Sequence, residues 1–111
     1  MKIAIIGSRD LRVCDLENYL PDGVDEIVSG GAKGIDSDAE AYANANGIKI
    51  TVFLPDYSIY KRGAPIVRNK QIADYADEVI AFWNGRSKGT KSVIDYCEKI
   101  SKKVTVIIRA G

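Results

Sequence analysis

Five short apolar runs, each built largely from β-branched or aromatic residues, constrain the fold of this 111-residue chain more than any other feature. Runs of this kind are typical of β-strands. The first, fourth and fifth lack polar alternation, which is typical of strands buried on both faces of a parallel sheet. The runs are residues 3–6, 26–28, 48–53, 78–82 and 104–108.

Each connection between these runs carries apolar residues at helical spacing. The fourth connection has the clearest pattern, because lysines and acidic residues occupy its other positions. The predicted buried faces are Val13, Leu16 and Leu20 in the first connection; Ile35, Ala39, Tyr42 and Ala43 in the second; Ile66, Ile72, Ala73 and Ala76 in the third, after Pro65; and Thr90, Val93, Ile94, Cys97 and Ile100 in the fourth.

Strands and helices therefore alternate, which predicts an α/β fold with right-handed crossovers. We expect one Rossmann-like domain over residues 1–111, with three layers and a five-stranded parallel sheet in the order 3-2-1-4-5. The chain length suits a single core, and no internal repeat or linker interrupts it.

Composition excludes several classes of function. The chain has no histidine, which removes Ser-His and Cys-His nucleophile pairs and disfavours a transition-metal site. Its net charge of +1 gives no broad basic surface for nucleic acid. Cys14 and Cys97 belong to no CxxC motif and are expected to be free thiols. Without a signal peptide or a membrane-spanning run, we expect a cytoplasmic protein that does not bind membranes.

Glycine-bearing loops follow the first, second and fourth runs. They read GSRD at 7–10, SGGAKG at 29–34 and NGRSKGT at 84–90. The predicted strand order brings all of them to one edge of the sheet, where open α/β folds bind ligands. Each loop combines glycine with a hydroxyl group and a cation, which suits phosphate binding next to helix N-termini. The alternative is that Ser8, Asp10, Ser87 and Thr90 are only helix caps and that the cations are solvated.

The common phosphate-binding fingerprints are absent. Gly34 is followed by Ile35, so the second loop does not read GxxxxGK[ST]. The glycines of that loop do not read GxGxxG either, and the loop follows the second run instead of the first. An ATPase or an ordinary NAD dehydrogenase is therefore disfavoured.

The long connection 54–64, LPDYSIYKRGA, is polar, aromatic and basic. Connections of this length in compact domains are often functional. Tyr57, Tyr60, Lys61 and Arg62 would either form a lid that stacks on a base and pairs with a phosphate, or pack the tyrosines against the sheet edge. Trp83 likewise would stack on a base or fill the margin of the core.

Four ordered motifs resemble the SLOG superfamily, which includes the Smf/DprA DNA-processing proteins and the LOG phosphoribohydrolases. The motifs are GSRD, VSGGAKGID, GAPIVRN and FWNGRSKGT, and they span nearly the whole chain. The small stand-alone YspA-like (YpsA-related) branch is the most similar. The family fold is Rossmann-like, in agreement with the fold expected from the pattern of strands and helices.

The resemblance implies a nucleotide or nucleotide-derived ligand, for example one related to ADP-ribose, and no other cofactor. It implies a binding module or sensor that forms a homodimer. Asp36 would bond ribose hydroxyls or cap a helix, and Arg68 and Asn69 would reach into the pocket. The ligand-binding residues carried over by position are Gly7, Ser8, Arg9, Ser29, Gly30, Gly31, Lys33, Asp36, Arg68, Asn69, Ser87, Gly89 and Thr90, with Gly34 closing the turn.

One departure bears on catalysis. The LOG hydrolases carry a glutamate in PGGxGTxxE, and Val93 occupies the matching position here. Valine cannot transfer a proton, so no catalytic residue is assigned. A nucleotide hydrolase in which Asp36 or Asp95 acts instead is the alternative. Binding of single-stranded DNA, as in the DNA-processing branch, is a second alternative, disfavoured by the neutral charge balance.

Overall fold

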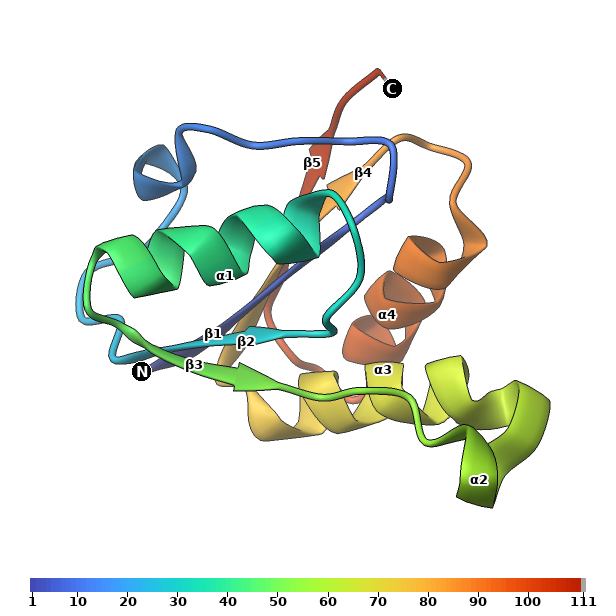
Figure 1. Cartoon of the computed structure of the whole chain (residues 1–111). Helices are drawn as coiled ribbons and strands as arrows, with labels where there is room; N and C mark the ends of the chain where they lie inside the picture. Colours follow the sequence, from blue (N-terminus) through green and yellow to red (C-terminus); the bar gives the residue numbers. More distant parts are fainter. Residues whose placement is uncertain (111) are drawn as a thin grey trace.

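The computed structural model describes residues 1–110 and confirms the predicted α/β architecture. All five strands pair in parallel, in the order β3-β2-β1-β4-β5. The helix α1 covers one face of the sheet, and α3 and α4 cover the other (Figure 1). The elements are β1 (Lys2–Gly7), β2 (Glu26–Ser29), α1 (Ile35–Ala45), β3 (Lys49–Val52), α2 (Tyr57–Tyr60), α3 (Ala64–Tyr75), β4 (Glu78–Trp83), α4 (Lys88–Lys99) and β5 (Val104–Ile108), with short 3₁₀ turns at Leu16–Asn18 and Lys61–Gly63.

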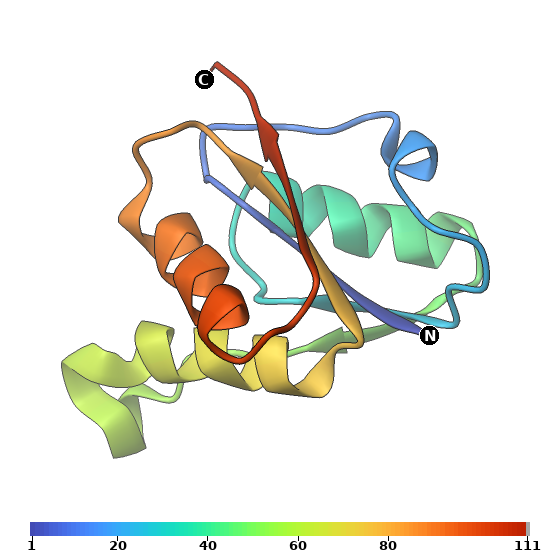
Figure 2. The ribbon, with the colours of Figure 1, turned by 180° about the vertical axis from the view of Figure 1, so that it is seen from behind.

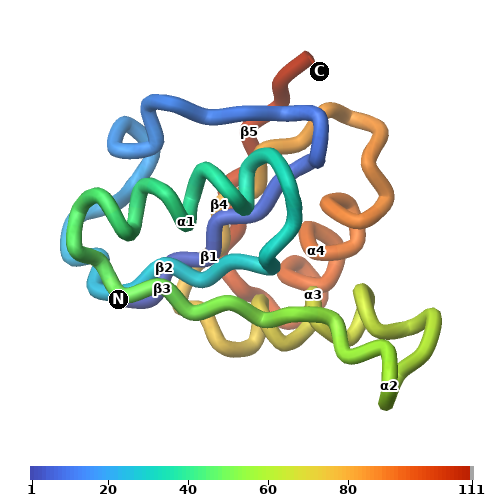
Figure 3. The backbone as a smooth tube through the Cα atoms, in the orientation of Figure 1, coloured from blue at the N-terminus to red at the C-terminus, as the bar shows by residue number. Residues whose placement is uncertain are grey.

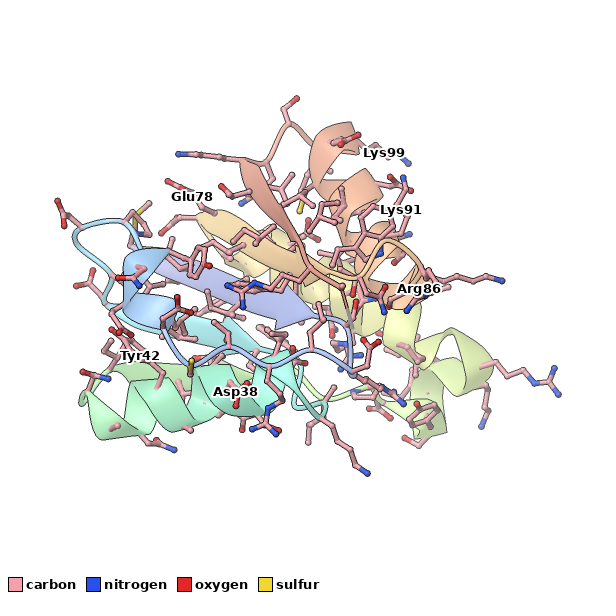
Figure 4. All side chains as sticks on the ribbon, turned by 90° about the horizontal axis from the view of Figure 1, so that it is seen from above. Asp38, Tyr42, Glu78, Arg86, Lys91 and Lys99 are labelled. Atoms are coloured by element: carbon pink, nitrogen blue, oxygen red, sulfur yellow. The ribbon has the colours of Figure 1, made fainter. Side chains whose placement is uncertain are left out.

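The core lies in two layers, one on each side of the sheet. The central strands β1 and β4 contribute to both layers, because their alternate residues point to opposite faces. Ile35 and Ala39 from α1 fill the first layer, and Val93 and Cys97 from α4 fill the second. Figure 4 shows Asp38 and Tyr42 on α1 across the sheet from Lys91 and Lys99 on α4.

The predicted helix in the first connection is wrong. This segment contains only the 3₁₀ turn at Leu16–Asn18, although Val13 and Leu16 are buried as expected. The Val13 N–H donates to the carboxylate of Asp38 on α1, at 2.8 Å, and Arg12 pairs with the same carboxylate. The backbone of the segment is thus bonded to a neighbouring helix while its apolar side chains still reach the core.

Two further expectations about burial are also corrected, and one alternative left open for the tyrosines is not observed. The strand β5 is not buried on both faces: it lies at the sheet edge, and its Ile108 is 65% exposed. Figure 2 shows β5 on the near side without a helix in front of it. Ile66 points outward from α3 and is 54% exposed, and Ile100 follows the end of α4 and is also exposed. Tyr57 and Tyr60 do not pack against the sheet edge, because α2 projects away from it.

Candidate functional site

A cavity of about 430 Å³ lies beyond the carboxyl ends of the strands. The loops after β1, β2 and β4 leave the sheet at this same end, and α3 passes beside them (Figure 3). A volume of this size is within the range of small-molecule sites. The lining residues are Ile6, Gly7, Ser8, Arg9, Asp10, Gly30, Ala32, Asp36, Pro65, Arg68, Asn69, Ile72, Asn84, Ser87, Gly89, Thr90 and Val93.

The loops after β1 and β4 are bonded to each other and form the rim of the cavity. The buried Ser8 hydroxyl accepts the Asn84 N–H at 3.2 Å, and the Asn84 amide donates to Asp10 at 2.9 Å. Gly7 allows this close approach, since a Cβ there would collide with the side chain of Ile35 and lie 2.9 Å from the carbonyl of Phe82. The rim is therefore held in place by bonds that involve no ligand.

The loop after β2 turns sharply to begin α1. Gly34 has φ +77°, and a Cβ there would lie 2.7 Å from the carbonyl oxygens of Arg9 and Leu11. Only glycine fits this position without strain. The turn places Asp36 in the first turn of α1, facing the cavity, and sends Lys33 outward into solvent.

Asp36 is the least satisfied polar side chain of the cavity. It is only 5% exposed, and its Oδ2 accepts the Ala32 N–H at 3.1 Å. Its Oδ1 is buried and has no hydrogen-bond partner among residues 1–110. Burial raises the pKa of the Asp36 carboxyl, against the hydrogen bond from Ala32 and the positive charge of Arg68. A buried carboxylate oxygen without a donor favours a ligand that brings one.

Arg68 crosses from α3 to the loop after β2. Its Nη1 donates to the carbonyl of Gly30 at 2.5 Å, and its Nε donates to Asn69 at 3.0 Å. Burial lowers the pKa of the guanidinium, and the charge of Asp36 opposes that shift. A Cβ on Gly30 would lie 2.9 Å from Arg68 Nη1 and 3.0 Å from Asp36 Oδ2. The absence of a side chain at Gly30 therefore leaves space for the side chains of Arg68 and Asp36.

The N-terminus of α4 forms the opposite wall. The Ser87 hydroxyl accepts the Thr90 N–H at 3.4 Å, and the Asn84 side chain accepts the N–H groups of Arg86 and Ser87 at 2.8 Å. The N–H groups in the first turn of a helix have no acceptor within the helix, and the helix dipole favours an anion beside them. With Arg9 and Arg68 on the rim, this wall has the chemistry of an anion site.

Most residues expected at the site line the cavity, but Ser29, Gly31 and Lys33 do not. The Ser29 side chain is fully buried, and it accepts the Gly31 N–H at 3.1 Å. Gly31 lines a smaller neighbouring cavity. Trp83 is also outside the lining, and its indole donates to the carbonyl of Ser87 at 3.0 Å.

Some lining residues were missed in the sequence. Asn84 directly follows the fourth apolar run and precedes Gly85, which is a signal for a loop side chain that braces a turn. Pro65 and Ala32 carry no chemical signal and line the cavity only because of the fold. Val93, on the buried face of α4, also lies on the cavity wall.

No cluster of side chains suited to a metal ion occurs within residues 1–110. In the same part of the chain, no helix is both long and apolar enough to cross a membrane. Cys14 and Cys97 are free thiols, as expected.

Comparisons of the chain with protein-family models, with curated protein sequences and with solved structures find no match.

Proposed function

We propose that this protein binds a nucleotide or nucleotide-derived ligand in the cavity at the carboxyl edge of the sheet, as a binding module or sensor. The observation that carries the proposal is that the buried carboxylate of Asp36, whose Oδ1 has no donor among residues 1–110, lines the same cavity as Arg9, Arg68 and the N-terminus of α4. An acceptor of this kind fits a ribose hydroxyl, which donates one hydrogen bond.

The other wall supports an anionic group on the same ligand. The N-terminus of α4 supplies backbone N–H groups, and Arg9 and Arg68 supply positive charge. A sugar phosphate presents several hydroxyl groups and a phosphate together, whereas a simple dicarboxylic acid such as succinate lacks hydroxyl groups and a neutral sugar lacks an anionic group. The motif resemblance to the SLOG superfamily agrees with this choice of ligand.

Binding is favoured over hydrolysis by the composition of the wall. Val93 is apolar where a proton-transferring carboxylate would be required. Burial raises the pKa of the Asp36 carboxyl on the cavity wall, but its Oδ2 is already bonded to the backbone. Cytoplasmic location and a homodimeric state stay predictions, which cell fractionation and light scattering would test.

Thermal unfolding in the presence of AMP, ADP, ADP-ribose, NAD and cyclic dinucleotides tests the proposal. A ligand at 100 times its Kd adds about 2.7 kcal/mol to the free energy of unfolding. For a domain of this size, that corresponds to a rise of about ten degrees in Tm. We expect a rise with at least one of these ligands, and chromatography of the incubated mixture to return that ligand unchanged.

Two variants make the assay specific. Thr90→Ala alters the α4 wall and should reduce the shift, whereas Lys33→Ala changes a solvent-exposed cation of the same loop and should preserve it. If no ligand of the panel raises Tm, or if both variants respond like the wild type, the proposed site is wrong.

A further inference from the structure

A second, smaller cavity of about 150 Å³ adjoins the first. The two share Arg9, Gly30, Ala32, Pro65 and Arg68, so they lie next to each other with these residues between them. The lining that belongs to the small cavity alone is Gly31, Leu54, Pro55 and Tyr57.

The two cavities differ in chemistry. The large cavity holds Asp36 and the α4 N-terminus, whereas the side chains that line the small cavity alone are those of a leucine, a proline and a tyrosine. Leu54 is 66% exposed and Tyr57 is 57% exposed, so the protein itself leaves these apolar surfaces uncovered. A cavity of about 150 Å³ is large enough for one aromatic ring.

Local backbone contacts shape the walls of the small cavity. Gly31 has φ +73°, and a Cβ there would lie 2.6 Å from Leu54 Cδ2 and 3.1 Å from Val52 Cγ1. The glycine thus allows the backbone to lie directly against Leu54. The Asp56 carboxylate accepts the N–H groups of Ser58 and Ile59 at 3.1 and 3.2 Å, which fixes the start of α2 and the position of Tyr57.

Two arginine side chains lie between the two cavities. Arg9 and Arg68 line both of them, and neither forms an ion pair within residues 1–110. Guanidinium groups at a junction between an apolar and a polar cavity suit a ligand whose aromatic ring is joined to an anionic part.

We propose that the small cavity is the subsite for the nucleobase, with the ring of Tyr57 as its stacking surface and Leu54 as its apolar wall. This inference rests on the proposed function, because the sugar and phosphate of the same ligand occupy the large cavity. It gives α2, which projects from the body of the fold in Figure 1, a role in choosing the ligand.

Calorimetric titration with AMP, ADP-ribose and ribose 5-phosphate tests the subsite, since ribose 5-phosphate lacks a base. Stacking of a base on an aromatic side chain changes affinity by about 10-fold or more when that side chain is replaced by alanine. We expect the wild type to bind AMP or ADP-ribose at least 10-fold more tightly than ribose 5-phosphate. Tyr57→Ala should remove most of this difference and leave the affinity for ribose 5-phosphate unchanged.

Two further variants separate stacking from a general effect on α2. Tyr57→Phe keeps the ring and should bind like the wild type. Tyr60→Ala removes an exposed aromatic side chain of the same helix that lies outside both cavities, and it should also bind like the wild type.

The outcomes distinguish the two proposals. Two results would overturn the base subsite: equal affinity of the wild type for all three compounds, or unaltered binding of AMP and ADP-ribose by Tyr57→Ala. Neither result would overturn the binding of the sugar and phosphate in the large cavity. If none of the three compounds binds, the base subsite is wrong, and the proposed function is wrong as well if ADP, NAD and cyclic dinucleotides also leave Tm unchanged.

Discussion

The guanidinium of Arg68 donates a hydrogen bond to the carbonyl oxygen of Gly30, which lies 38 residues earlier in the chain, at 2.5 Å. This bond joins α3 to the loop after β2 and places a positive charge between the two cavities. The second terminal nitrogen of Arg68 has no hydrogen-bond partner in the described part of the chain, residues 1–110. The same side chain therefore supports the loop and offers a donor to an anionic ligand.

Replacing Arg68 with lysine should weaken both roles. Lysine keeps the charge but cannot bond Gly30 and Asn69 together, because it lacks the planar fork of arginine. We expect Arg68→Lys to lower the free energy of unfolding by about 1 kcal/mol and to weaken ligand binding about 10-fold. Urea unfolding and calorimetry measure the two effects. Arg62→Lys, at an exposed position, is the control and should change neither.

Asp36→Asn should bind ligand poorly yet unfold at a higher temperature near neutral pH. The folded state raises the pKa of Asp36, so the contribution of Asp36 to stability is fully present at acid pH and is lost as the pH rises through the folded-state pKa. The neutral amide avoids this loss. We expect the variant to exceed the wild type in Tm at pH 7 by about 4 degrees, for a gain of about 1 kcal/mol.

The pH dependence of this difference identifies its cause. The difference between Asp36→Asn and the wild type should shrink toward zero below the unfolded-state pKa of aspartate, where Asp36 is protonated in both states. A constant difference from pH 3 to pH 8 would show that the charge of Asp36 is not responsible. The comparison with the wild type at each pH cancels the carboxylates whose pKa is lowered, such as Glu26 and Asp38.

Gly34→Ala should destabilise the fold far more than a matched glycine variant. Gly34 combines a left-handed φ with a collision between its new Cβ and two backbone carbonyls at 2.7 Å. Gly47 has φ +64° but no heavy atom within 4 Å of the added Cβ. We expect Gly47→Ala to cost about 1 kcal/mol from backbone strain alone and Gly34→Ala to cost more than 3 kcal/mol. Similar midpoints in urea for the two variants would contradict the tight turn at Gly34.

Asn84→Ala tests whether the bonded rim supports the cavity. The Asn84 side chain donates to Asp10 and accepts from the backbone of Arg86 and Ser87. Its loss should lower the free energy of unfolding by about 1 kcal/mol and weaken ligand binding, because the loops after β1 and β4 are no longer bonded through this side chain. Asn44→Ala, on α1 and away from the cavity, is the control. Equal ligand affinity in both variants would mean that the rim does not depend on Asn84.

The sheet could be predicted because each strand carries its own apolar run, and the strand order follows from the regular alternation with helices. The conformation of the first connection could not be predicted in this way. Val13, Leu16 and Leu20 satisfy helical spacing, but the structure keeps this segment non-helical through a hydrogen bond to Asp38, which comes 25 residues after Val13. The spacing of apolar residues carries no information about a hydrogen-bond partner that is distant in the sequence. The exposure of β5 likewise depends on which strand lies at the edge of the sheet.

The candidate site likewise contains some residues that could be predicted from the sequence and others that could not. Gly7, Gly30 and Asp36 could be placed because the loops that carry them must converge at one edge of a parallel sheet. Lys33 does not line the cavity, because the direction of its side chain depends on the turn at Gly34 and not on the composition of the loop. The small cavity was not foreseen, because it requires Gly31 and Leu54 to meet across 23 residues.

Amide chemical shifts, followed by NMR during titration with AMP and with ADP-ribose, test the central claim most directly. We expect one or both compounds to shift the amide signals of Ala32, Asp36 and Gly89, which surround the large cavity, and to leave those of Thr105 and Val106 on β5 unchanged. If neither these compounds nor ADP, NAD or a cyclic dinucleotide shifts the cavity signals, or if the shifts gather on β5, the cavity is not a nucleotide site.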